Sequence, residues 1–251
     1  MSKQLFLIAL ATIGTLASCS KDDTTPTPTP TPTPPSSAAT TPTYATGDGA
    51  IVALVTRTTT NTPIGAIDYD LGTGVAVFGT MGGTTFNDAG KVTLNSKELT
   101  KQSNNSYVYL PSATDMTGID LDGAINWSVT TPSFTYNAGS GTGRGMPNAS
   151  AIAGTYSSVD ANAAFTLALS GSVSNADSVY FQINGPSKSI LKRMSGSTTT
   201  VTFTADEVKS LGKSVGCSVT IAPWNHQQKT LGGKIIHVIN ELAISRTIEI
   251  K

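Results

Sequence analysis

The chain has 251 residues, and its 16 lysines and arginines balance 16 aspartates and glutamates, so its formal net charge is zero. Charged residues make up 13% of the chain, which is well below the ~25% of typical soluble domains. A balanced charge without a basic block lacks the electrostatic pattern of a nucleic-acid-binding protein, so we expect no nucleic acid partner.

A short apolar run opens the chain. It covers residues 5–16, and at about 12 residues it has the length of a secretory signal and is too short to span a bilayer as a helix. Ala17, Ser18 and Cys19 follow it. Leu16-Ala17-Ser18-Cys19 resembles the lipobox of bacterial lipoproteins, which implies that residues 1–18 are a removed signal peptide and that Cys19 is the acylated first residue. An ordinary signal peptide followed by a chance cysteine is the alternative.

Residues 19–46 are predicted to form a disordered Thr/Pro-rich tether. Threonine and proline alternate from Thr25 to Pro34, and proline fixes φ and has no N–H, so this stretch favours polyproline II. The charged run from Ser20 to Asp23 is similar to the export signal of Bacteroidota-type surface lipoproteins. That resemblance implies an outer-membrane protein facing the cell exterior, whereas a solvated linker is the alternative.

Residues 47–139 are expected to form a β-rich domain. Short apolar runs alternate with turn residues, and the segments 91–95, 106–110 and 124–129 have the period of two that is typical of half-buried strands. Trp127 lies in the last of these and is predicted to be in the core. Strands at such regular spacing favour an antiparallel sandwich or barrel.

A glycine-rich stretch from Asn137 to Asn148 follows, and it is typical of a linker between domains or of a mobile loop. We therefore predict a domain boundary near residues 140–149. A phosphate-binding glycine loop does not fit, because no Gly-Lys-Ser/Thr sequence ends the stretch.

Residues 149–251 are expected to form a second β domain with one short helix. The helix is predicted over 204–212, where Thr204 can cap the N-terminus and Gly212 can end it. The order of elements and the ending 240–250 resemble immunoglobulin-like domains of bacterial surface proteins. Together the two halves predict an all-β chain of two antiparallel β-sandwich (immunoglobulin-like) domains, although the Cys–Trp–Cys signature of antibody domains is absent.

Side chains with catalytic or metal-binding chemistry are few. Cys217 is the one thiol besides Cys19 and is expected to be buried in a strand. The two histidines, His226 and His237, have no second ligand at metal-binding spacing, and His237 is expected to face solvent from a strand. Neither a metal nor a cofactor is predicted, and no Gly-x-Ser-x-Gly sequence indicates a nucleophilic serine.

Three acidic residues, Asp115, Asp120 and Asp122, cluster before Gly123. The calcium-loop pattern fails here, since the later position expected to hold glutamate is the apolar Val129. Turn-forming aspartates are the simpler interpretation, and a calcium site of another type is the alternative.

The sequence Trp224-Asn225-His226 is predicted to lie in a polar turn and gives the only candidate ligand site. An exposed indole beside amide side chains offers a sugar an apolar stacking face and hydrogen bonds. The alternative is that Trp224 packs beneath its own loop.

These patterns predict a non-catalytic binding or structural lipoprotein whose partner is the membrane, through Cys19, with a glycan or another surface protein as a further partner. A carbohydrate-binding lipoprotein that assists glycan uptake is the alternative, and a hydrolase is the second alternative.

Overall fold

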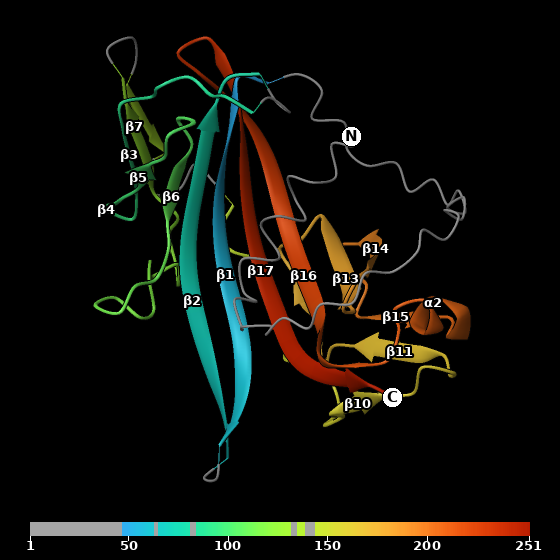
Figure 1. The fold of residues 1–251 in the computed structure, drawn as a ribbon. Coiled ribbons are helices and arrows are strands. Elements are labelled where there is room, and N and C mark those ends of the chain that lie inside the picture. Colours follow the sequence, from blue (N-terminus) through green and yellow to red (C-terminus); the bar gives the residue numbers. More distant parts are fainter. Residues whose placement is uncertain (1–46, 63–64, 81–83, 132–134, 139–143) are drawn as a thin grey trace, which may run out of the picture. The chain divides into compact units, whose positions relative to one another are not determined.

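The structure is a computed structural model that describes residues 47–62, 65–80, 84–131, 135–138 and 144–251. The predicted signal peptide, Cys19 and the tether lie outside the described residues. The chain divides into two units, residues 1–44 and 45–251, and every element below belongs to the second. This unit is all-β, with several sheets and the short helix α2, as predicted for the fold class (Figure 1).

A nine-stranded sheet forms the largest part of the unit, in the order β14-β13-β16-β17-β1-β2-β6-β5, with β10 also paired to β17. Its neighbours run antiparallel except that β17 is parallel to both β1 and β10. The strands are β1 (Gly49–Thr62), β2 (Gly65–Phe78), β5 (Thr100–Lys101), β6 (Tyr107–Tyr109), β10 (Ser158–Val159), β13 (Ser178–Asn184), β14 (Ser189–Ser195), β16 (Ser214–Leu231) and β17 (Lys234–Ile250).

Three smaller sheets and the helix accompany the large sheet. Their orders are β4-β3-β7-β8, β11-β15 and β12-β9. The elements are β3 (Lys91–Leu94), β4 (Lys97–Glu98), β7 (Trp127–Thr130), β8 (Thr135–Ala138), β9 (Asn148–Ala149), β11 (Phe165–Ala168), β12 (Val173–Ser174), β15 (Thr200–Phe203) and α2 (Ala205–Lys209).

The large sheet joins the two halves that the sequence led us to expect as separate domains. The pairing of β1 with β17 runs in parallel from Gly49–Ile236 to Thr58–Ser245. Residues 45–251 accordingly form one compact unit, in which strand pairing crosses the predicted boundary near residues 140–149. Figure 1 shows β1 and β2, in blue and teal, beside β17 and β16, in red and orange.

The main core cluster lies on one face of this sheet, although Ala50, Val52 and Leu54 on the other face of β1 are buried as well. Side chains alternate along a strand, so Ile51, Ala53 and Val55 of β1 point to the same side, and all three belong to the core cluster. The smaller sheets supply the opposite side of that cluster, with Trp127 from β7 and Phe203 from β15. This two-layered packing is consistent with a β-sandwich.

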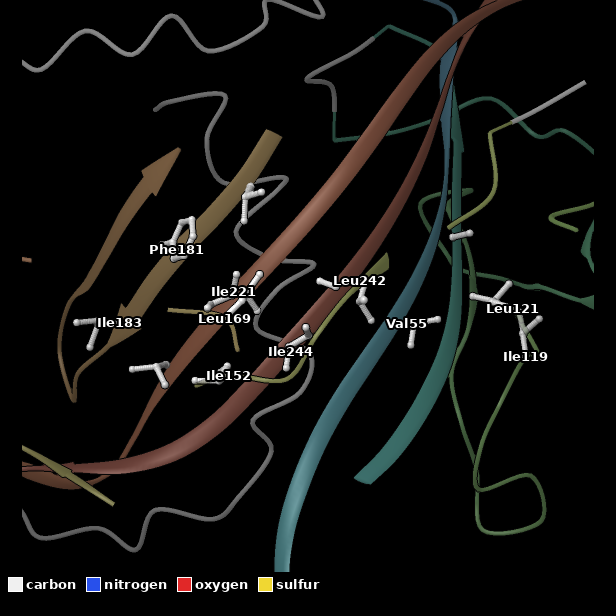
Figure 2. Close-up of a cluster of buried hydrophobic side chains, with 14 of the residues drawn as sticks. Val55, Ile119, Leu121, Ile152, Leu169, Phe181, Ile183, Ile221, Leu242 and Ile244 are labelled. Atoms are coloured by element: carbon white, nitrogen blue, oxygen red, sulfur yellow. The ribbon is translucent and has the colours of Figure 1, made fainter. Parts of the chain in front are cut away.

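Figure 2 shows part of this core. Val55, Ile221 and Leu242 come from long strands of the large sheet, and Leu121 and Leu169 come from segments outside the large sheet. Burial of such side chains is the main favourable contribution to the stability of the fold.

Several local predictions are confirmed. Trp127 and Cys217 are buried. Helix α2 begins after Thr204, whose hydroxyl accepts a hydrogen bond from the Glu207 backbone N–H while the Glu207 side chain accepts one from the Thr204 N–H. Gly212 follows the helix at a φ of 78°, in the left-handed region that glycine adopts easily.

The prediction that His237 faces solvent is wrong, because only 3% of this residue is exposed. The prediction of a turn around Trp224 is also wrong, since β16 runs unbroken from Ser214 to Leu231. Its pairing with β17 is interrupted at Pro223, which has no N–H to donate, and resumes at Trp224. Proline therefore marks a gap in the ladder here and not the end of a strand.

Candidate functional site

The three residues of the predicted ligand site are consecutive in β16, so their side chains alternate between the two faces of the sheet. Trp224 is only 2% exposed. Its ring stacks on Tyr180, with centroids 5.8 Å apart and an interplanar angle of 9°, and the Arg193 guanidinium lies 5.3 Å from its centroid. The indole thus contacts its own fold on the face where a sugar was predicted to stack, and the expected exposed ring is wrong.

Asn225 is fully buried on the opposite face, where it fixes a connecting segment to the sheet. Its Nδ2 donates to the backbone oxygens of Gly145, at 2.9 Å, and Asn175, at 2.8 Å. Asn240, directly across on β17, donates to the Arg144 backbone oxygen at 2.7 Å and to the Asn225 Oδ1 at 3.1 Å. This pair of amides, which we call the amide clamp, gives Asn225 a structural role, because a buried carboxamide needs such hydrogen-bond partners.

His226 faces His237 across β16 and β17. The Nε2 of His226 and the Nδ1 of His237 are 2.8 Å apart, and the His226 backbone N–H donates to the Asp177 carboxylate at 2.8 Å. Burial, aided by the nearby His237, holds the pKa of His226 below its ordinary value. The described ranges contain no group of three or more His, Cys, Asp or Glu side chains that could hold a metal ion. The contact between His226 and His237 is thus a hydrogen bond between two imidazole rings.

Glu241 is a buried carboxyl that we did not predict. It pairs with Trp224 across β16 and β17 and lies level with Leu54 of β1. It is 2% exposed, and in the described part of the chain its Oε2 has no hydrogen-bond partner. Burial raises the pKa of Glu241 to about 7. The sequence signal was a single charge inside the otherwise apolar run of β17, which we interpreted only as part of a last strand.

A small cavity, the terminal pocket, opens where β1 and β17 begin and β2 ends. Its volume is about 150 Å³. The Asp48 carboxylate at its edge accepts a hydrogen bond from the Ile235 backbone N–H at 2.8 Å and lies 3.4 Å from the Lys234 ammonium. The residues that line the pocket are Asp48, Phe78, Asn87, Asp88, Ala89, Thr131, Lys234 and Ile236.

Asp88, on the other side of the terminal pocket, is held by three donors. Its carboxylate accepts hydrogen bonds from the Tyr107 hydroxyl at 2.6 Å, the Lys101 ammonium at 2.7 Å and the Gly90 N–H at 2.9 Å. These donors, led by Lys101, hold the pKa of Asp88 well below its usual range. Burial and the contact with Asp88 raise the pKa of Tyr107 to about 12. Asp88 is therefore a charged and firmly oriented group at neutral pH.

Two of the three aspartates considered for calcium accept hydrogen bonds from neighbouring groups. The Asp115 carboxylate accepts hydrogen bonds from Lys97, at 2.8 Å, and from the Tyr109 hydroxyl. Asp120 accepts a hydrogen bond from the Asp122 backbone N–H at 2.9 Å, which is the local contact of a turn-forming aspartate.

Neither a family model, nor a curated protein, nor a solved structure matches the chain. Within the residues that the structure describes, no helix is long and apolar enough to cross a membrane.

Proposed function

We propose that the protein is a lipid-anchored, non-catalytic binding or structural module of the outer membrane that faces the cell exterior. The observation that carries the proposal is Leu16-Ala17-Ser18-Cys19 directly after an apolar run of signal-peptide length. The Thr-Pro alternation then separates Cys19 from β1, which begins at Gly49. An acylated Cys19 on this tether would keep the β unit near the membrane surface but outside the bilayer.

The contacts of the polar side chains support a non-catalytic role. Asp88, Asp115 and Asp177 each accept hydrogen bonds from neighbouring donors, and Asn225 binds backbone carbonyls. A catalytic acid or base must instead reach a substrate proton. Glu241 has a pKa suited to acid–base chemistry, but it is only 2% exposed.

The finer assignment of residues 149–251 as an immunoglobulin-like sandwich belongs to the same proposal. Its support is the run β14-β13-β16-β17 in one sheet and the separate two-stranded sheet of β11 and β15, which share one core cluster through Phe181 and Phe203. The carbohydrate-binding alternative loses its predicted platform, since Trp224 is enclosed.

Membrane fractionation of the protein from its native cell tests the anchor. Cys19→Ala should move the protein from the membrane to the soluble fraction or leave it unprocessed, and it should abolish labelling by an alkynyl palmitate analogue. Cys217→Ala is the matched control, because it removes the other, buried cysteine and should leave both readouts unchanged. Labelling and fractionation that survive Cys19→Ala would contradict the proposal.

Protease treatment of intact cells tests the orientation. A protein on the outer face should be degraded by added proteinase K while a periplasmic marker stays intact. Protection equal to that of the marker would contradict surface display and leave the anchor untouched.

A further inference from the structure

The terminal pocket has an apolar floor and a polar rim. Phe78, Ala89 and Ile236 are buried side chains that line it. The Phe78 ring is fixed edge-on against Tyr107, with centroids 6.1 Å apart and an interplanar angle of 76°. Small-molecule sites commonly combine such an apolar surface with a few well-placed polar groups.

The rim carries both acceptors and donors, and its charges are already compensated. Asp48 lies beside Lys234, and Asp88 forms an ion pair with Lys101. A charged ligand would have to compete with these pairs, whereas a hydroxyl can donate to a carboxylate lone pair that is still available. The rim therefore favours a neutral ligand rich in hydroxyl groups.

Asn87 offers a ligand in the pocket a carboxamide group. It is exposed and lines the pocket, and within the described ranges no hydrogen bond ties its carboxamide to the rest of the fold. A carboxamide both donates and accepts, which matches a hydroxyl group.

The volume sets the size of the ligand. A cavity of about 150 Å³ is below the ~300 Å³ at which drug-sized ligand sites begin, so it can take one ring of a ligand and not a larger molecule. One pyranose ring fits that description, with its C–H face on the floor and its hydroxyl groups at the rim.

We propose that the terminal pocket binds one neutral pyranose ring, either free or at the end of a glycan. This site is separate from the Trp224 region. It gives the binding role proposed above a ligand class, and it depends on that proposal only for where in the cell the protein meets its ligand. Because it uses few contacts, the affinity for a single ring should be about millimolar.

Ligand-detected saturation-transfer NMR on the full-length protein, in a detergent without a sugar headgroup, tests this site. The probes are the methyl glycosides of glucose, galactose, mannose and N-acetylglucosamine. At least one should bind, and Asn87→Ala and Lys234→Met should each weaken that binding about three- to tenfold, the effect of one lost hydrogen bond. The Lys234 side chain is 57% exposed, so its replacement should leave the fold intact.

Asn162→Ala is the matched control. It removes another exposed asparagine side chain. The preceding residue, Ala161, donates a backbone hydrogen bond to Lys251, which follows the end of β17 that is away from the pocket. Asn162→Ala should therefore leave the affinity unchanged. Absence of binding by all four glycosides, or equal affinities in the Asn87→Ala and Asn162→Ala proteins, would overturn the proposal. Anchoring at Cys19 is measured separately, so a failure here does not count against the anchor.

Discussion

Replacing Glu241 with glutamine should stabilise the protein relative to wild type, and this gain in the free energy of unfolding should be larger at alkaline pH than at acidic pH. Glu241 lies on β17, which pairs with β1 and β16, and the pKa of its buried carboxyl is raised by burial alone. Burial disfavours the charged form, because the ion loses its hydration without gaining a partner. Glutamine has nearly the same shape and carries no charge, so Glu241→Gln removes the titration and little else.

The magnitude follows from linkage. The pKa of Glu241 is raised from 4.5 to about 7, and one pH unit in pKa corresponds to about 1.4 kcal/mol, so ionisation destabilises the fold by about 3 kcal/mol. This destabilisation is absent below about pH 4.5, grows between pH 4.5 and 7, and is complete above pH 7. The glutamine amide changes the free energy of unfolding by an amount that does not vary with pH.

Urea denaturation of both proteins at pH 4.5, 6, 7 and 8 measures the effect. The free energy of unfolding of Glu241→Gln minus that of wild type should rise by about 3 kcal/mol from the lowest pH to the highest. Other groups titrate in both proteins and cancel in the difference. Glu249→Gln, at a partly exposed site on the same strand, is the control for loss of an acidic side chain. A difference for Glu241→Gln that is flat with pH would refute the reasoning.

Two further substitutions test the contacts that position the fold. Asn225→Ala removes the donor to the Gly145 and Asn175 carbonyls, so it should lower the free energy of unfolding by about 1–3 kcal/mol and speed trypsin cleavage after Arg144. Unchanged cleavage relative to Asn162→Ala would contradict the amide clamp. Thr204→Ala removes the cap of α2 and should lower the free energy of unfolding by about 1 kcal/mol; an unaltered urea midpoint would show that the cap contributes nothing.

Local patterns predicted the class of the fold and several of its elements. The alternation around Trp127 indicated a strand with a buried face, and the spacing of Thr204 and Gly212 indicated a capped helix. These features depend on neighbours within a few residues, so they are visible in the sequence.

Long-range pairing could not be predicted in the same way. No local signal in Ala50–Val55 states that β1 will pair with β17, almost 190 residues later, so the chain was interpreted as two domains. Pro223 and Asn225 indicated a turn by composition, but Asn225 satisfies its amide through the distant Gly145. Tertiary contacts thus override local propensity at the predicted site.

The terminal pocket also depends on this pairing. Its polar residues Asp48, Asp88 and Lys234 come from separate parts of the chain, and only the meeting of β1, β2 and β17 brings them together. The isolated charge at Glu241 was visible in the sequence, but its position between strands from both halves was not.

The proposed function depends above all on Cys19 being the acylated first residue of the mature protein. Mass spectrometry of the N-terminal proteolytic fragment, from protein isolated from native membranes, tests it most directly. We expect a fragment that starts at Cys19 and carries a thioether-linked diacylglycerol, with no peptide from residues 1–18. A fragment that retains Met1, or one that starts at an unmodified Cys19, would contradict it.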